Sequence, residues 1–187
     1  MKRLALIGAL ALAAAGCGGT KTVTVTETLT TTRTVTTTAA PASVAACTGS
    51  DLGATFALVQ GSAGAGQIVY RLTMKNTSQA ACWVSGLPQA QLLDANGSPL
   101  PTHVVSSNRG VGTAARLVLQ PGGSATTEAR FSPDVAGSGD KQTGACQPRA
   151  ALLRVTPNGG GTVDAPVQPP TSVCEQGTLQ FDLLSRA

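Results

Sequence analysis

The sequence predicts an all-β fold for residues 47–187, an antiparallel two-sheet β-sandwich of the immunoglobulin-like type. Short runs of alternating apolar and polar residues follow one another after Cys47, and clusters of Gly, Pro and Asn separate them. Such alternation places one set of side chains on each face of a strand, and no run of ten residues in this part has helical periodicity. Regularly spaced strands over about 140 residues predict one sandwich domain rather than two domains.

The clearest predicted strand covers residues 67–75. Its apolar and polar residues alternate, so that one face is buried and the other meets solvent. The apolar face has Ile68, Tyr70, Leu72 and Met74, and the polar face has Arg71, Thr73 and Lys75. Similar patterns predict eight further strands, at residues 55–60, 90–94, 103–105, 116–120, 125–131, 151–156, 162–167 and 179–184.

Turn sequences separate these predicted strands. Gly supplies the backbone conformations that tight turns require, Asn favours turns, and Pro does not continue a central strand. The turn sequences are Asn76-Thr77-Ser78, Asn96-Gly97, Pro121-Gly122-Gly123, Asn158-Gly159-Gly160-Gly161 and Pro169-Pro170.

Disulfides are expected to strengthen a core that is poor in aromatic residues. Aromatic residues make up 3% of the chain, and Phe56, Tyr70, Phe131 and Phe181 stand at positions that can face inward. An even number of cysteines in an exported domain indicates disulfides, each stabilising the fold by about 2–4 kcal/mol. Four cysteines permit three pairings. We favour Cys47 with Cys82 and Cys146 with Cys174, because each pair ties segments that border neighbouring strands.

The first residues predict a lipoprotein signal peptide over 1–16 and a lipidated Cys17. Lys2 and Arg3 precede an apolar run from Leu4 to Ala15, and small residues lead up to the cysteine. The run is too short to span a bilayer, which needs about 20 apolar residues. We therefore expect a protein held on the extracytoplasmic face of the cell membrane by lipid on Cys17, with an ordinary secretory signal as the alternative.

Residues 17–46 are predicted to be a disordered, Thr-rich linker. The segment from Thr20 to Thr38 alternates threonine with valine in places, which resembles a strand locally, but it offers little apolar surface to bury. A coil of about 30 residues has an end-to-end distance of about 30 Å, so the folded domain is expected to stay close to the membrane.

The charge of the domain argues against nucleic acid as a partner. The chain has 13 basic and 9 acidic residues, but four of the basic residues (Lys2, Arg3, Lys21 and Arg33) and one acidic residue (Glu27) precede Cys47. The domain itself is therefore nearly neutral, and its sequence shows no basic patch.

Motifs in a fixed order also give the domain a resemblance to a known family. They include the strand that ends in Lys75-Asn76-Thr77-Ser78, Cys82-Trp83-Val84-Ser85-Gly86-Leu87-Pro88, Leu117-Val118-Leu119-Gln120-Pro121-Gly122-Gly123, Cys146-Gln147-Pro148 and Val173-Cys174. Together they resemble an actinobacterial exported-lipoprotein domain known as domain of unknown function 4232. The resemblance implies a secreted β-sandwich in a bacterial envelope with these cysteines as landmarks, and it supplies no catalytic residue.

No catalytic, cofactor or metal site is predicted. His103 is the only histidine, the chain has no Gly-x-Ser-x-Gly motif, and we expect His103 to be an ordinary strand residue. Asp134 and Asp140 frame a loop that lacks the ligand pattern of a calcium loop, because Ala136 and Ala145 stand at ligand positions, so a polar surface loop is expected. The cysteines also lack the Cys-x-x-Cys spacing of a zinc site.

Trp83 is the candidate binding residue. It follows Cys82 on a predicted alternating segment, so it should face away from the disulfide and be at least partly exposed; the alternative is that it covers the edge of a sheet. We expect a non-enzymatic envelope lipoprotein that binds or positions a protein or an envelope component. A carbohydrate-binding or cell-wall-binding module is the alternative, a hydrolase is less favoured, and a purely structural spacer is a further possibility.

Overall fold

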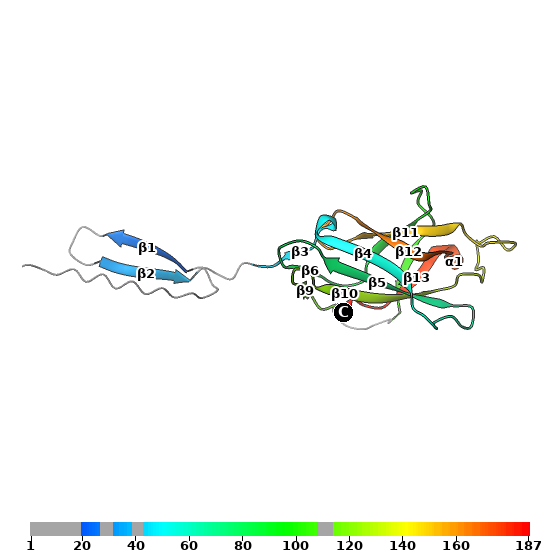
Figure 1. Ribbon diagram of the computed structural model, residues 1–187, viewed down its shortest axis with the longest axis horizontal. Coiled ribbons are helices and arrows are strands. Elements are labelled where there is room, and N and C mark those ends of the chain that lie inside the picture. Colours follow the sequence, from blue (N-terminus) through cyan, green and yellow to red (C-terminus); the bar gives the residue numbers. More distant parts are fainter. Residues whose placement is uncertain (1–19, 27–31, 39–42, 108–113) are drawn as a thin grey trace, which may run out of the picture. The chain divides into compact units, whose positions relative to one another are not determined.

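The computed structural model describes residues 20–26, 32–38, 43–107 and 114–187 (Figure 1). The chain divides into two units, residues 1–43 and 44–187. In the first unit, β1 (Thr20–Thr26) pairs antiparallel with β2 (Thr32–Thr38), from Thr20 opposite Thr38 to Thr26 opposite Thr32. The signal peptide and Cys17 lie outside the described residues, so the lipid anchor stays a prediction. Residues 20–26 and 32–38 of the predicted disordered linker form paired strands instead. No helix in the described part of the chain is long and apolar enough to cross a membrane.

In its described residues, the second unit is all-β, with a nine-stranded sheet and a three-stranded sheet. The large sheet has the order β7-β11-β12-β4-β5-β10-β13-β8, with β14 also paired to β10, and the small sheet has the order β3-β6-β9. The strands of the large sheet are β4 (Leu52–Leu58), β5 (Ile68–Asn76), β7 (Gln89–Leu93), β8 (His103–Ser106), β10 (Ser124–Phe131), β11 (Arg149–Thr156), β12 (Val163–Ser172), β13 (Thr178–Phe181) and β14 (Ser185–Arg186). Those of the small sheet are β3 (Ala45–Ala46), β6 (Cys82–Val84) and β9 (Leu117–Leu119), and two short turns are η1 (Gly49–Asp51) and α1 (Cys174–Gly177).

The large sheet curls into a nearly closed barrel, because the segment before β8 binds the strand at the opposite end of the order. Leu100 donates its backbone N–H to the carbonyl of Leu92 on β7 at 2.8 Å, and the N–H of Leu92 binds the hydroxyl of Thr102 at 2.9 Å. His103 then begins β8. A sheet whose ends approach in this way leaves little free edge.

The predicted all-β class and the presence of disulfides are confirmed, whereas the arrangement of the sheets differs from the prediction. The strands form a barrel-like sheet with a small additional sheet, not clearly an immunoglobulin-like two-sheet sandwich. Three strand pairs are also parallel, β12 with β4, β13 with β8, and β3 with β6. Hydrophobic alternation reports which face of a strand is buried but not which strand lies beside it, so it could not distinguish these arrangements.

All nine predicted strand positions contain strands. In β5 the predicted faces are confirmed, since Tyr70, Leu72 and Met74 are buried while Arg71 and Lys75 are exposed. The predicted turn at Pro169-Pro170 lies inside β12 instead. There the register with β11 shifts. Ala150 is aligned with Thr171 and Leu152 with Pro166, so residues 167–170 of β12 bulge opposite the single residue Ala151. The prolines occupy this irregular stretch, where a missing N–H breaks no ladder hydrogen bond.

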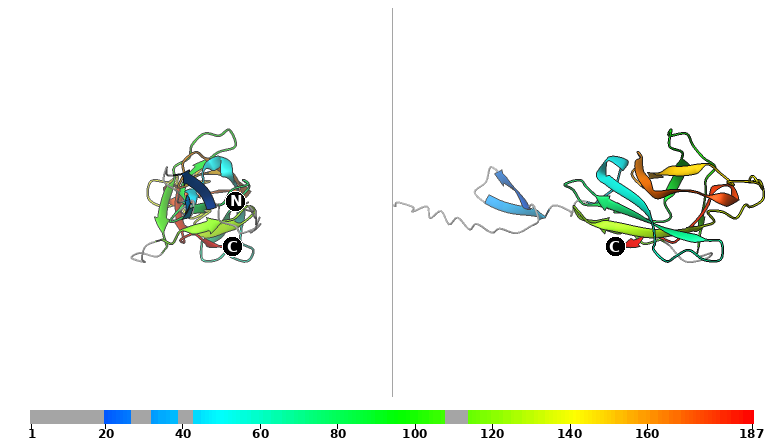
Figure 2. Two further views of the ribbon diagram at one scale, coloured as in Figure 1. Left: turned by 90° about the vertical axis from the view of Figure 1, so that its left-hand side faces the viewer. Right: turned by 45° about the vertical axis from the view of Figure 1, so that its right-hand side comes forward.

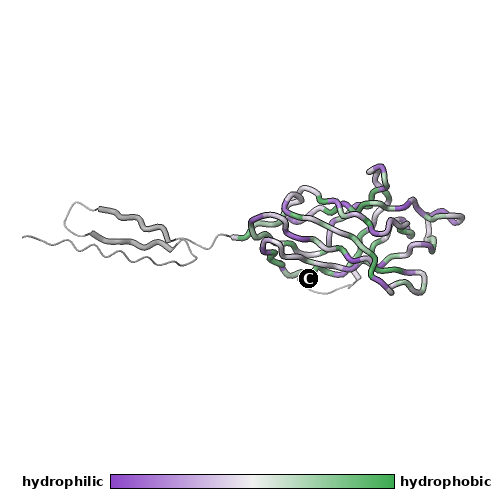
Figure 3. The backbone as a smooth tube through the Cα atoms, viewed as in Figure 1, coloured by the Kyte–Doolittle hydropathy of each residue, from purple (hydrophilic) through white to green (hydrophobic). Residues whose placement is uncertain are grey.

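The core contains the four aromatic residues that the sequence places inside. Phe56, Tyr70, Phe131 and Phe181 are each at most 3% exposed, and the Phe56 and Tyr70 rings lie 5.2 Å apart. The Tyr70 hydroxyl donates to the carbonyl of Pro169 at 2.8 Å, so its polar atom is also satisfied. Figure 3 shows hydrophobic and hydrophilic residues interspersed along this unit, in keeping with strands that bury one face.

The structure has the two disulfides that we favoured, Cys47–Cys82 and Cys146–Cys174. The first joins the start of the domain to β6 of the small sheet, and the second joins the loop before β11 to α1. Figure 1 and the right-hand view of Figure 2 show the small sheet and α1 at opposite ends of the second unit. The two bonds therefore brace different ends of the domain.

Asn76 attaches the small sheet to the large one. Its side chain is fully buried at the end of β5, and its amide donates to the carbonyl of Leu119 on β9 at 3.0 Å and to that of Ala80 at 2.7 Å. Its backbone also exchanges hydrogen bonds with Gly122 and Gly123 in the turn after β9. Asn76 is therefore a structural residue of the predicted turn.

A candidate binding site between the two sheets

A pocket of about 330 Å³ opens where the small sheet meets the large one. Its floor is apolar, formed by the buried side chains of Met74, Val84 and Val155, and Leu87 and Leu184 extend this surface toward solvent. The remaining lining residues are Ser85, Pro88, Gln89, Thr156, Pro157, Asn158 and Gly160.

Close backbone contacts hold one wall of the pocket to the start of the domain. In the turn after β11, the Gly159 N–H donates to the carbonyl of Cys47 at 2.8 Å, and the Gly49 N–H donates to the carbonyl of Gly160 at 2.9 Å. A Cβ atom on Gly159 would come within 2.7 Å of that Cys47 oxygen, so only glycine fits there. The Cys47–Cys82 disulfide then connects this wall to β6.

The other wall is the segment that leaves β6. Two hydrogen bonds hold Ser85 in place. Its N–H donates to the side-chain oxygen of Asn158 at 2.8 Å, and its hydroxyl donates to the carbonyl of Ala114 at 3.2 Å. The Leu184 N–H donates to the carbonyl of Gly86 at 3.2 Å, which ties the segment after β13 to the same wall. The pocket is thus built from segments far apart in the sequence and held by hydrogen bonds between them.

Within the described ranges 43–107 and 114–187, the lining of this pocket contains no ionisable side chain and no aromatic ring. Its apolar floor and its hydroxyl and amide groups at the rim suit an uncharged ligand group with a hydrophobic body. No sequence pattern indicates this site, because Met74, Val84, Val155 and Leu184 each resemble ordinary core residues of separate strands.

Trp83 lies on the face of β6 opposite to this pocket. It is half-buried, whereas its neighbours Cys82 and Val84 are 5% and 1% exposed, which confirms that it points away from the disulfide. The Arg116 guanidinium stands over the indole, 4.3 Å from the ring centroid, in a cation–π contact. This contact covers one face of the ring, the surface that a sugar would need for stacking.

His103 is exposed on β8, where Thr178 of β13 is its backbone neighbour. Among the described residues, no hydrogen bond joins it to a carboxylate or to a hydroxyl group. The Ser107 hydroxyl instead donates to the Asp182 carboxylate. The described structure therefore does not bring together the serine, histidine and acid of a hydrolase triad.

Asp140 is not the surface residue that we expected, since it is only 8% exposed. One carboxylate oxygen accepts the Gln147 amide at 2.8 Å and the Gln176 N–H at 2.9 Å, and the other accepts the N–H groups of Gly137 and Glu175. Its partners in α1 lie 35 and 36 residues away in the sequence, so no local pattern reveals them. Asp134 is exposed, as expected.

These four donors stabilise the charged form of Asp140. They lower its pKa to about 2, with the Gln147 side chain as the largest cause and the backbone N–H groups as further ones, while burial acts in the opposite direction. Glu175 and Gln176 have positive φ values of 53° and 55°, an unfavourable backbone conformation for residues with side chains. The Asp140 carboxylate holds both amides in place and so stabilises this left-handed turn.

The neighbourhood of Asp140 superficially resembles a metal site. One ligand atom from each of Asp140, Cys146 and Cys174 lies within 4.8 Å of the others. The two sulfur atoms are bonded to each other in a disulfide, whereas thiolate is the form that binds metal. The carboxylate oxygens already accept four hydrogen bonds, so this cluster is structural.

Together these features define a disulfide-braced all-β domain with an uncharged pocket. The chain belongs to the family described as Domain of unknown function (DUF4232), whose model matches residues 47–183. No curated protein and no solved structure matches the chain significantly.

Proposed function

We propose that this protein is an envelope-anchored lipoprotein whose β-domain, without catalysis, binds or positions a protein or another envelope component. The observation that carries the proposal is the pocket between the two sheets, with its apolar floor and hydrogen-bonding rim. An uncharged apolar side chain of a partner, or a similar group of an envelope molecule, fits this chemistry. General acid–base catalysis needs ionisable groups, and the pocket lining that the structure describes has none.

The anchor belongs to the same proposal. Cys17 follows a basic start, a short apolar run and small residues, which is typical of bacterial lipoprotein signals. A cysteine that carries two acyl chains is held stably at a membrane. The protein would then act on the extracytoplasmic side of an actinobacterial envelope, with the Thr-rich segment as a spacer. A carbohydrate-binding module is less well supported, because Arg116 covers one face of Trp83.

Site-specific crosslinking in the cells that make the protein tests the pocket. A photoreactive amino acid replaces Gln89, an exposed residue of the pocket rim, in the full chain; the matched control carries it at Thr55, an exposed residue of β4 that does not line the pocket. We expect a discrete adduct from position 89 that is absent from position 55, because only position 89 borders the proposed ligand.

A second substitution separates specific binding from random contact. Thr156→Phe adds bulk at the half-exposed rim without replacing a core residue, and it should lower the yield of the position-89 adduct about tenfold or more by occupying the pocket. Circular dichroism establishes that this variant is folded. Equal adducts from positions 89 and 55, or an adduct unaffected by Thr156→Phe, would show that the pocket is not the binding site.

A further inference from the structure

The small sheet has an outer face that carries the only tryptophan of the chain. Across its three strands, Ala46 is aligned with Trp83 and Trp83 with Val118. The neighbouring residues Cys82 and Leu119 are 5% and 2% exposed and face inward, so the aligned residues face outward. The cation–π contact shows that Arg116, two residues before Val118, shares this face.

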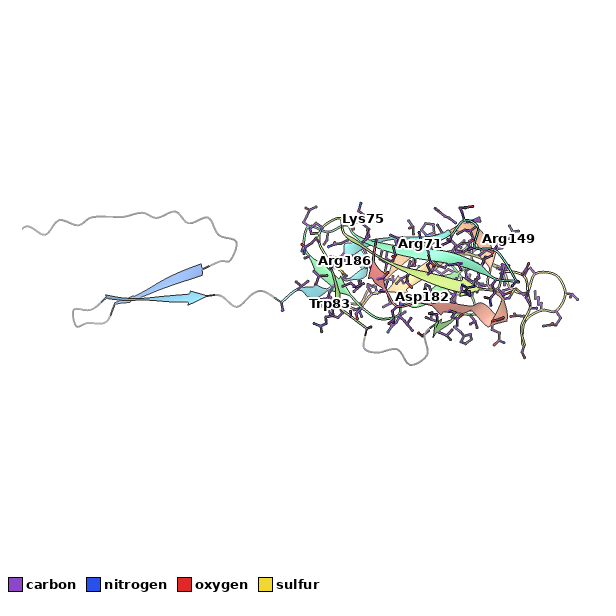
Figure 4. The ribbon with its side chains drawn as sticks, turned by 90° about the horizontal axis from the view of Figure 1, so that it is seen from below. Arg71, Lys75, Trp83, Arg149, Asp182 and Arg186 are labelled. Atoms are coloured by element: carbon purple, nitrogen blue, oxygen red, sulfur yellow. A yellow bond between two sulfur atoms is a disulfide. The ribbon has the colours of Figure 1, made fainter. Side chains whose placement is uncertain are left out.

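Further cations border this face. Arg186 and Val118 line the same shallow hollow of about 120 Å³, and Ser124 of that hollow is aligned with Lys75 on β5. Figure 4 shows Lys75, Arg186 and Trp83 at the same end of the domain. We call the following residues together the tryptophan face: Ala46, Lys75, Trp83, Arg116, Val118 and Arg186. Acidic residues also lie near this end. Asp51 stays charged, because the hydroxyl and the N–H of Thr48 donate to its carboxylate at 2.7 and 2.8 Å and lower its pKa. Glu128 and Asp182 share a second hollow with Arg186.

The chain enters the domain through the same sheet. β3 (Ala45–Ala46) is the first strand of the second unit, and Val44, directly before it, is 38% exposed. If Cys17 carries the anchor, the small sheet is the part of the domain separated from the membrane by the shortest length of chain. A tether of about 30 residues raises the local concentration of membrane at this sheet, so that a weak surface contact suffices for docking.

We propose that the tryptophan face docks on anionic lipid headgroups of the membrane that carries the anchor. Tryptophan is enriched where an apolar ring meets the headgroup region, and Arg116, Arg186 and Lys75 supply the charge that attracts anionic lipids. Val118, which is aligned with Trp83, and the exposed Val44, directly before β3, add apolar surface to this sheet. The proposal rests on the proposed anchor, and it adds that the domain is oriented on the membrane with its small sheet inward.

The fluorescence of Trp83 provides the test, because no other tryptophan contributes. The chain from Cys17 to Ala187 is coupled through Cys17 to a maleimide lipid in vesicles of phosphatidylcholine, with or without phosphatidylglycerol. Cys17 is the one cysteine outside the two disulfides, so the coupling is specific. We expect brominated lipids to quench Trp83 and its emission to shift to the blue only in the anionic vesicles, and added salt to reverse both effects.

Arg186→Gln should lower the docking equilibrium constant about fivefold, the contribution of one cation at an anionic surface. The matched control is Arg149→Gln, which removes the same charge from an exposed position at the start of β11, away from Trp83 in Figure 4. The proposal is overturned if lipid quenching is the same with and without phosphatidylglycerol, or if both variants change it equally. Because the maleimide lipid supplies the anchor, docking is measured even if Cys17 is not acylated in cells; native lipidation is tested separately.

Discussion

Replacing Cys47 and Cys82 together by serine should lower the free energy of unfolding by about 3–4 kcal/mol. The bond closes a loop of 35 residues, and its loss releases the corresponding chain entropy in the unfolded state. The effect should extend to function, because Cys47 accepts a hydrogen bond from one pocket wall and Cys82 lies in β6, which continues into the other. Urea unfolding followed by the fluorescence of Trp83 measures the change in free energy.

The second disulfide gives the matched comparison. Replacing Cys146 and Cys174 by serine opens a loop of 28 residues and should cost a similar free energy. That bond lies at the opposite end of the unit from the small sheet, so the position-89 adduct should persist in this variant and be lost without Cys47–Cys82. An unfolding midpoint unaffected by removal of Cys47–Cys82 would show that this bond does not stabilise the domain.

Asp140→Asn should destabilise the domain at neutral pH and weaken its response to acid. The folded-state pKa of Asp140 is about 2, below the ordinary value of 3.8, so its contribution to stability is fully present above about pH 4 and is lost as the pH falls toward 2. An asparagine amide would place N–H groups against N–H donors on one side of the site. The thermal midpoint should therefore fall by several degrees at pH 7, and the fall in stability between pH 4 and 2 should become shallower.

Asp134→Asn is the control, because it removes the same charge from an exposed position in the same loop. Its thermal midpoint should remain close to that of the unmodified protein across this pH range. If Asp140→Asn and Asp134→Asn had the same midpoints at pH 7, the hydrogen bonds of Asp140 would not hold the α1 turn in place.

The sequence predicts strand positions better than strand neighbours. The alternation around Tyr70 and Leu72 is strong enough to locate β5 and its buried face, because each residue's environment follows from the period of two. β3, β6 and β14 contain only two or three residues, too few to show a period. The closure of the large sheet depends on Thr102 meeting β7, a contact that no local pattern contains.

For the candidate site, too, local patterns predict the environment of a single residue but not the contacts between distant segments. The orientation of Trp83 was predictable, since it follows from adjacency to a buried half-cystine. The pocket was not, because its lining comes from strands whose proximity is set by the three-dimensional arrangement. The burial of Asp140 was missed for a related reason, since two of the four amides that bind it come from α1, 35 and 36 residues further along the chain.

The mass of the N-terminal peptide of the mature protein, isolated from the membrane fraction of its own cells, tests the proposed anchor most directly. We predict a peptide that begins at Cys17 and carries a diacylglyceryl group, and we predict that Cys17→Ser removes the protein from the membrane fraction. An unmodified Cys17 in a protein released from the membrane would contradict the proposal that this domain acts as a tethered envelope component.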